Sequence, residues 1–184
     1  MKTGKNLLFV VLIVLAMLSR LIPHAPNFTA VAAAGLFAGF AFGREIKSFL
    51  IPLVALWLSD LLINNIIYAQ YYEGFRLFTP GFYWIYGGML AAVVIGRIGL
   101  SSFKILPLAG AGLSSAVVFY IITNFGAWIG NPLYAQNISG LMASYTAALP
   151  FLLNQVLGTF FYGAIIFGAA YAFTRKPAVR GVNA

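Results

Sequence analysis

The sequence predicts an all-α integral membrane bundle of six transmembrane helices, built as a single transmembrane domain over residues 1–184. Composition is the first reason: 62% of the residues are hydrophobic and 8% are charged, against roughly 25% charged residues in soluble domains. Length is the second, because six spans of about 20 residues with short connections use nearly the whole chain. The third is that basic residues stand at the borders of apolar runs, which is typical of membrane topology rather than of a nucleic-acid-binding face.

The apolar runs define the six expected spans. They cover approximately residues 7–21, 29–42, 49–68, 81–95, 105–125 and 151–173. No small-residue cleavage site follows the first run, so we expect a span there rather than a signal peptide. Pro23 and Pro26 end the first helix, and Pro150 suits the first turn of the last one. Residues 139–149 are expected to form a short interfacial helix.

The second span is short and rich in small residues. Ala30, Ala34 and Ala38 share one helical face, with Gly35 and Gly39 beside them. Because small residues four apart allow helix backbones to approach closely in lipid, we expect this span at the centre of the bundle.

Lys and Arg residues set the expected orientation. Alternation along six spans places nine of them on one side, namely Lys2, Lys5, Arg44, Lys47, Arg97, Lys104, Arg175, Lys176 and Arg180, and two on the other, Arg20 and Arg76. The side with more basic residues faces the cytoplasm. Both chain termini are therefore expected in the cytoplasm. The chain has no cysteine, which excludes disulfides and thiolate chemistry.

Polar side chains gather in the outer halves of the expected spans, whereas the cytoplasmic halves are apolar. An amide or carboxylate facing lipid is costly, so these groups should face the bundle interior or line a cavity. We expect aromatic stacking on Trp84, Tyr86 and Trp128. The full set of expected substrate-binding residues is Arg20, His24, Asn27, Asp60, Asn64, Trp84, Tyr86, Tyr120, Asn124, Trp128 and Asn154.

Several of these residues also have a structural interpretation. Asp60 is the only acidic residue within a span, and it can bind a solute, pair with Arg20, or join a network with Asn64 and Asn124. Arg20 can equally anchor its helix at the membrane interface. His24 lies between two prolines at the expected outer mouth, where it can cap a helix or contact a ligand. One histidine with so few carboxylates does not predict a metal site.

A polar outer half above an apolar floor describes a cup that captures a solute from outside. Residues 23–28, 69–80 and 126–149 would then act as lids. An ion channel needs polar lining through its full depth, and a proton pump needs acids in more than one layer. With no paired acid and base we expect no enzyme. Two alternatives stay open, a non-transporting scaffold or partner subunit and an intramembrane enzyme of unknown reaction.

Four segments resemble a known family: Ser19–Thr29, Leu58–Asp60, Asn124–Trp128 and Ala147–Phe151. They are similar to the substrate-binding S-components of energy-coupling-factor (ECF) vitamin transporters, and most similar to the solitary cobalamin transporters of the BtuM branch. The resemblance implies six helices with cytoplasmic termini in the bacterial inner membrane and an outward-facing pocket for a vitamin-like solute. Cobalamin is the favoured solute, as transported ligand and not as cofactor.

The sequence departs from that family in two respects. BtuM proteins use a cysteine near the third-span loop as a cobalt ligand, and this chain has none, so His24 is the expected substitute. S-components that dock a shared energising module carry Ala-x-x-x-Ala in the first helix. Here that spacing stands in the second, at Ala30, Ala34 and Ala38, which argues against such a module as a partner.

Overall fold

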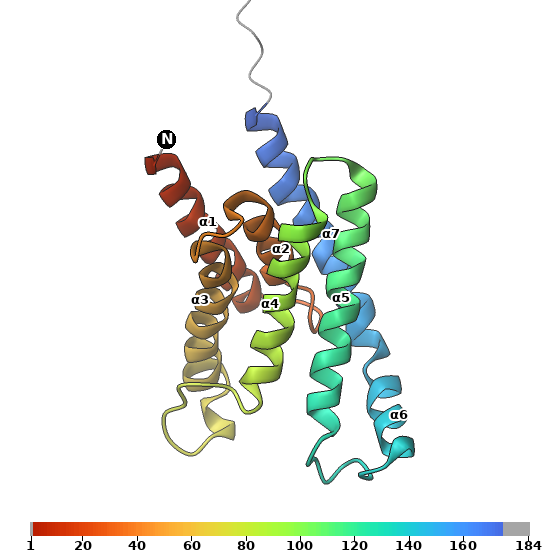
Figure 1. Cartoon of the computed structure of the whole chain (residues 1–184). Helices are drawn as coiled ribbons and strands as arrows, with labels where there is room; N and C mark the ends of the chain where they lie inside the picture. The colour runs from red at the N-terminus through yellow and green to blue at the C-terminus, as the bar shows by residue number, and fades with distance from the viewer. Residues whose placement is uncertain (1, 175–184) are drawn as a thin grey trace, which may run out of the picture.

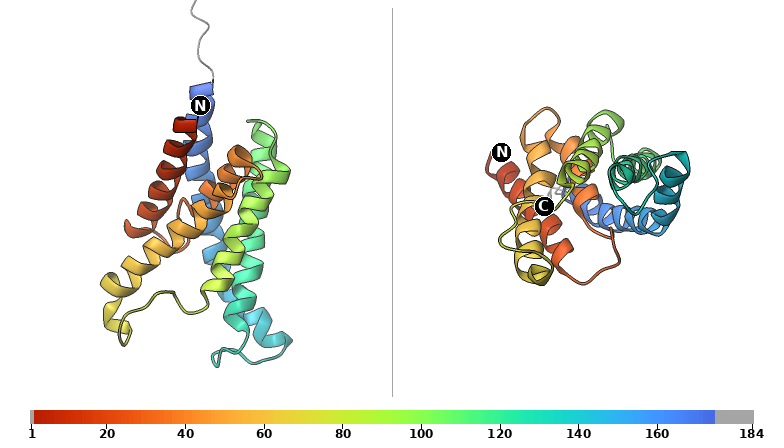
Figure 2. Two further views of the ribbon diagram at one scale, coloured as in Figure 1. Left: turned by 60° about the vertical axis from the view of Figure 1, so that its left-hand side comes forward. Right: turned by 90° about the horizontal axis from the view of Figure 1, so that it is seen from below.

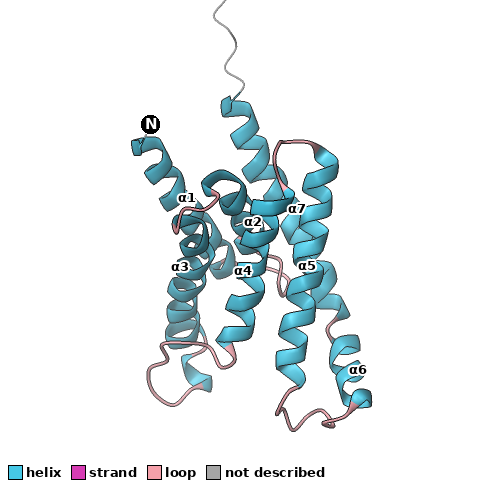
Figure 3. Cartoon of the chain, in the orientation of Figure 1, coloured by secondary structure: helices cyan, strands magenta, loops and turns pink. Residues whose placement is uncertain are grey.

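The computed structural model describes residues 2–174, with side chains from residue 4 onward, and every regular element in that range is a helix (Figure 3). The expected basic residues Arg175, Lys176 and Arg180 lie outside the described residues. The elements are α1 (Lys2–Leu21), α2 (Val31–Phe42), α3 (Lys47–Leu62), a π-helical turn η1 (Ile63–Ile67), a 3-10 turn η2 (Ala69–Tyr71), α4 (Phe82–Gly99), α5 (Ile105–Trp128), α6 (Ile138–Ala147) and α7 (Leu149–Thr174).

The helices run up and down between two ends of an elongated bundle (Figure 1). The start of α1, the α2–α3 turn, the α4–α5 turn and the end of α7 lie at one end, which we call the terminal end. The α3–α4 connection, the α5–α6 connection and α6 lie at the opposite, distal end (Figures 1 and 2). Of the described basic residues, Lys5, Arg44, Lys47, Arg97 and Lys104 belong to segments at the terminal end, and Arg76 belongs to the distal α3–α4 connection. Arg20, expected on the outer side, lies at the end of α1, about halfway along the bundle.

Five helices are long and apolar enough to cross a membrane: α1, α3 continued by η1, α4, α5 and α7. The chain thus has the character of a membrane-embedded, multi-pass protein. The sixth expected span corresponds to α2, which has 12 residues. At 1.5 Å per residue it is about 18 Å long, against a hydrocarbon core of about 30 Å. The short helix expected at residues 139–149 is present as α6.

Helix α2 lies at the centre of the bundle, as its small residues predict. Ten of its 12 residues are buried, and it packs against α1, α3, α4, α5 and α7. Its contact with α4 is a backbone contact. A Cβ at Gly39 would lie 2.7 Å from the Arg97 amide nitrogen, and one at Gly96 would lie 2.8 Å from the Leu36 Cα. Glycine at both positions therefore allows the two helices to touch.

The α1–α2 connection, residues 22–30, lies near the middle of the long axis and not at an end (Figures 1 and 2). Ser19 fixes it, because its hydroxyl accepts from the Ala30 amide at 2.9 Å and donates to the Ala16 carbonyl at 2.7 Å. On the other side Gly158 of α7 leaves room for the chain: a Cβ there would lie 2.9 Å from the Phe28 Cα.

The expected place of this connection at the outer mouth, as a lid, is therefore wrong. Helix α1 begins at Lys2, at the terminal end, and its 20 residues run from there toward the middle of the bundle. Helix α2 then runs back toward the terminal end over only 12 residues. Both helices stop about halfway along the bundle (Figure 2). The distal half is built from α3, α4, α5, α6 and α7 alone.

The terminal end is closed by packed side chains and by polar contacts at its surface. Lys5 of α1 forms an ion pair with Glu45 at 2.8 Å, and Lys47 donates to the Asn6 side chain at 2.7 Å. The hydrogen bond from Lys5 holds the pKa of Glu45 below its ordinary value. These contacts join the start of α1 to the α2–α3 turn.

Candidate functional site

A cavity of about 610 Å³ lies between the α1–α2 connection and the distal parts of α3, α4, α5 and α7. Its volume is in the range of small-molecule binding sites, about 300–1,000 Å³. Seen from below in Figure 2, α3 stands on one side of the connection and α7 on the other. The lining residues are Arg20, Leu21, Ile22, Pro23, His24, Asn27, Thr29, Val31, Leu56, Ile63, Ile67, Tyr68, Ile85, Met89, Phe119, Thr123, Asn124, Ala127 and Gln155.

The floor of the cavity is the α1–α2 connection itself. Its turn places Asn27 in the left-handed region with φ of 66°, a conformation that asparagine tolerates better than most residues. The His24 Nδ1 atom lies 2.7 Å from the Ala25 carbonyl oxygen. A carbonyl oxygen can only accept, so Nδ1 is the donor in this contact.

An ion pair closes one corner of the floor. Arg20, at the end of α1, lies 2.7 Å from the Asp60 carboxylate of α3, and it also donates to the Leu56 carbonyl at 3.1 Å and to the Ser59 hydroxyl. The Tyr86 hydroxyl of α4 donates to the second Asp60 oxygen at 3.0 Å. The Asp60 side chain is 3% exposed, whereas 19% of the Arg20 side chain is open. The pair of Asp60 with Arg20, one of the alternatives left open for Asp60 by the sequence, is present in the structure.

The π-helical turn η1 shapes the wall formed by α3. The Tyr68 amide donates to the Ile63 carbonyl at 2.7 Å, five residues back, so the regular four-residue repeat is broken there. Asp60, Asn64 and Tyr68 are spaced four residues apart, which would put them on one face of a regular α-helix. In the structure Asn64 is buried and donates to Thr79 at 3.0 Å, while Tyr68 is half exposed and lines the cavity.

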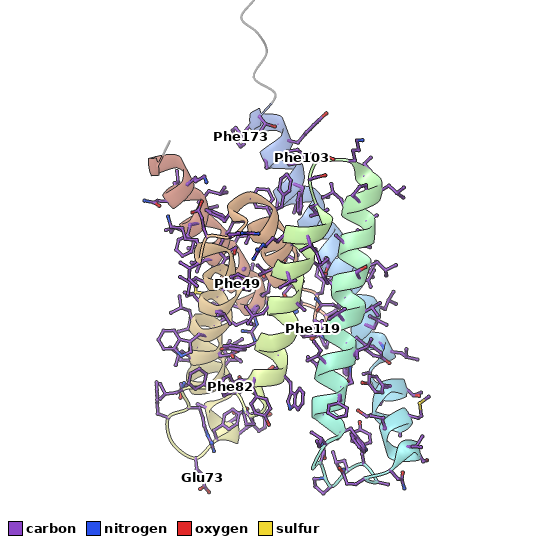
Figure 4. All side chains as sticks on the ribbon, viewed as in Figure 1. Phe49, Glu73, Phe82, Phe103, Phe119 and Phe173 are labelled. Atoms are coloured by element: carbon purple, nitrogen blue, oxygen red, sulfur yellow. The ribbon has the colours of Figure 1, made fainter. Side chains whose placement is uncertain are left out.

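The opposite wall comes from α5 and α7. Phe119 faces α4 (Figure 4), where a Cβ at Gly88 would lie 2.8 Å from its ring. Thr123 and Asn124 also line the cavity, and each donates to its own helix, to the Phe119 and Tyr120 carbonyls. Gln155 of α7 completes the wall. It is 1% exposed, and neither its Oε1 nor its Nε2 atom has a hydrogen-bond partner.

The structure brings four of the expected site residues together in the cavity: Arg20, His24, Asn27 and Asn124. Asp60 and Tyr86 stand directly behind Arg20. The remaining five expected residues do not line the cavity, and these are Asn64, Trp84, Tyr120, Trp128 and Asn154. Gln155 was missed in favour of its neighbour Asn154.

The expected stacking of a solute on Trp84, Tyr86 and Trp128 has no support in the cavity geometry. Trp84 packs on Gly126 and makes an edge contact with Phe125 at 5.6 Å. Trp128 donates to the Ala135 carbonyl at 2.9 Å. All three aromatic residues hold helices or connections together, and Phe119 and Tyr68 are the aromatic side chains that line the cavity instead.

The two distal connections are fixed by their own hydrogen bonds. Asn65 pairs with the backbone of Arg76, accepting at 2.7 Å and donating at 2.8 Å. Gln136 donates to the Trp128 carbonyl at 2.9 Å. Helix α6 is docked by the Tyr145 hydroxyl, which donates to Ile121 at 2.8 Å, and burial raises the pKa of Tyr145. Of the two distal segments expected as lids, residues 69–80 and 126–149, only Ala127 at the end of α5 lines the cavity.

A second cavity, of about 530 Å³, lies between α5, α7 and the α4–α5 turn, toward the terminal end. It is lined by apolar residues such as Phe103, Phe160 and Phe167, with no amide or charged side chain. Binding sites need a few placed polar groups to fix ligand orientation. The distal cavity has them, so it is the candidate site.

Comparison with known proteins gives one match. A family model described as a family of unknown function, DUF6580, matches residues 2–180. No curated protein and no solved structure matches the chain. The family match covers nearly the whole bundle, including every residue of the distal cavity. The chain belongs to the DUF6580 family.

Proposed function

We propose that this protein is a membrane transporter or substrate-binding subunit that captures a vitamin-like micronutrient from the outer side of the bacterial inner membrane. The observation that carries the proposal is the distal cavity. It is of ligand size and rests on a floor halfway along the bundle. On the terminal side of the floor, buried apolar side chains of α1, α2 and α3 pack together, and the second cavity lies beside them between α5 and α7. A cavity closed by such a floor can hold a solute without opening a continuous path for it across the membrane.

The direction of uptake rests on the basic residues. Lys5, Arg44, Lys47, Arg97 and Lys104 lie at the terminal end, which the excess of Lys and Arg assigns to the cytoplasm. With α2 counted as the sixth span, both termini are cytoplasmic. The cavity then faces the periplasm.

Cobalamin is the solute implied by the resemblance to BtuM-type S-components. The Nε2 atom of His24, on the cavity floor, is the acceptor that could reach its cobalt. A corrinoid exceeds a drug-sized ligand, and a cavity of about 610 Å³ holds only part of one. Smaller vitamins therefore stand beside cobalamin as candidate solutes.

We expect purified protein to bind a vitamin saturably, in a panel of cyanocobalamin, riboflavin, biotin, nicotinamide and nicotinate. Ala127→Trp fills the cavity from α5 and should lower that affinity by about tenfold or more, since each tenfold step is only about 1.4 kcal/mol. Ala143→Trp, on the exposed surface of α6, is the matched control and should bind normally. Isothermal titration measures both. A scaffold or partner subunit would bind none of these vitamins. If both variants lost affinity equally, the distal cavity would not be the binding site.

The proposed orientation predicts the labelling pattern of single cysteines. The natural chain has no cysteine, so each variant reports one site. Glu73→Cys, at the distal end (Figure 4), should react with a membrane-impermeant maleimide in intact spheroplasts. Lys104→Cys, in the α4–α5 turn, should react only after the membrane is opened. The reverse labelling pattern would show that the distal end faces the cytoplasm, and this would contradict the uptake proposal.

A further inference from the structure

Among the buried polar side chains of the described residues, Gln155 is the one whose amide atoms have no hydrogen-bond partner. Its oxygen and nitrogen are both buried without a partner, and the residue is 1% exposed. Buried polar groups in folded proteins nearly always have a partner, because leaving one unmet costs the desolvation of that group. An amide with both ends unmet indicates that a partner arrives from outside the chain.

No polar group of the described residues lies within hydrogen-bond distance of the Gln155 amide. Gly158, one turn further along α7, is pressed against the Phe28 and Thr29 backbone, which holds the start of α7 in place. Across the cavity, the Asn124 amide and the Thr123 hydroxyl each donate a hydrogen bond to a backbone carbonyl of their own helix. Gln155 lines the cavity, but its two amide atoms are themselves covered, so a solute reaches them only when a neighbouring side chain of the wall moves aside.

The charged residues that line the cavity indicate which class of solute it can bind. Arg20 is the only lining residue among Lys, Arg, Asp and Glu, and Asp60 neutralises it at 2.7 Å. A carboxylate solute would find no uncompensated cation, and its oxygens would also face the Gln155 carbonyl oxygen. A cationic solute would likewise find no free anion. The cavity suits a neutral solute.

We propose that Gln155 recognises a neutral amide-type edge of the solute, in which a hydrogen-bond donor stands beside an acceptor. Primary amides, lactams and ureides have this edge, and each can satisfy both ends of the glutamine amide at once. The inference rests on the proposed function and makes Gln155 its specificity-determining residue. A site built for such a pair rejects analogues that lack it, because the protein group is then left unpaired.

The test compares Gln155→Met with wild type and with Asn154→Leu, a matched control on the same helix that does not line the cavity. The probes are nicotinamide and nicotinate, as an amide and acid pair, with riboflavin, biotin and cyanocobalamin as further carriers of lactam, ureide or amide groups. The bound probe should carry the amide-type edge, and Gln155→Met should weaken its binding by about tenfold or more. Asn154→Leu should bind as wild type does.

A second measurement needs no ligand. Because Met has nearly the volume of Gln without its polar atoms, Gln155→Met should raise the melting temperature of the unliganded protein. A lower melting temperature would show that water or protein already satisfies the amide, and this would overturn the inference. Unchanged binding by Gln155→Met would overturn it as well while leaving the proposed uptake intact. If wild type binds no probe, the uptake proposal fails and this inference with it.

Discussion

Replacing Gly96 with alanine should separate α2 from α4 and prevent the folded protein from accumulating. A Cβ at position 96 would overlap the Leu36 carbonyl group and lie 2.8 Å from the Leu36 Cα. These are backbone atoms of a helix that is buried on nearly all sides, so no side-chain rotation relieves the overlap. Overpacking of a core costs about 1–3 kcal/mol or more, and here we expect the upper end. Thermal unfolding of the purified protein, and its yield in membranes, measure the effect.

The matched control is Gly87→Ala, on the same helix α4. A Cβ at position 87 has no atom within 4 Å, and alanine favours a helix over glycine by about 1 kcal/mol. This variant should be as stable as wild type or slightly more so. Equal behaviour of the two variants would show that α2 and α4 are not in backbone contact.

Removing the charge of Asp60 should have the second largest effect. In Asp60→Asn the Arg20 guanidinium keeps its charge next to a neutral side chain that is almost fully buried. Breaking a buried ion pair from one side costs about 3–5 kcal/mol. We expect about 3 kcal/mol, because 19% of the Arg20 side chain remains open. A large drop in melting temperature in detergent should report this loss.

The double variant Arg20→Met with Asp60→Asn separates charge from packing. It carries no buried charge, so it should be clearly more stable than Asp60→Asn alone, and the cycle of four proteins gives the coupling between the two residues. Glu73→Gln, an exposed acid on the α3–α4 connection, is the control and should change nothing measurable. A double variant less stable than Asp60→Asn would mean that Arg20 stabilises the bundle without Asp60.

Much of the fold could be predicted from the sequence because apolar runs in a membrane protein have few alternatives to helix. The central place of α2 followed from Ala34, Gly35 and Ala38, since only small side chains permit contact on every side. The pair of Arg20 and Asp60 could be named because a charge within a span needs a partner. The expected limits of each long helix lie within a few residues of those observed.

Depth and rotation about the helix axis were harder to predict. The depth of the α1–α2 connection depends on where α1 starts relative to the other helices, which no local pattern encodes. The π-helical turn shifted Tyr68 away from the face of Asp60. Asn154 and Gln155 enter the membrane at the same depth but point about 100° apart. The available signal was Gly158 and Thr159, which lie three and four residues beyond Gln155 and so share its interior face.

The short length of α2 has an electrical consequence. A membrane potential falls mainly across the part of a protein that excludes water, and each 100 mV acts on a unit charge with about 2.3 kcal/mol. Under the proposed function, in which water fills the distal cavity from outside, that voltage drop is compressed into a septum about as thick as α2, about 18 Å. An ion carried through the septum would feel the whole potential over this short distance. An uncharged solute would cross it with no electrical work, so its uptake should not depend on the polarisation of the membrane.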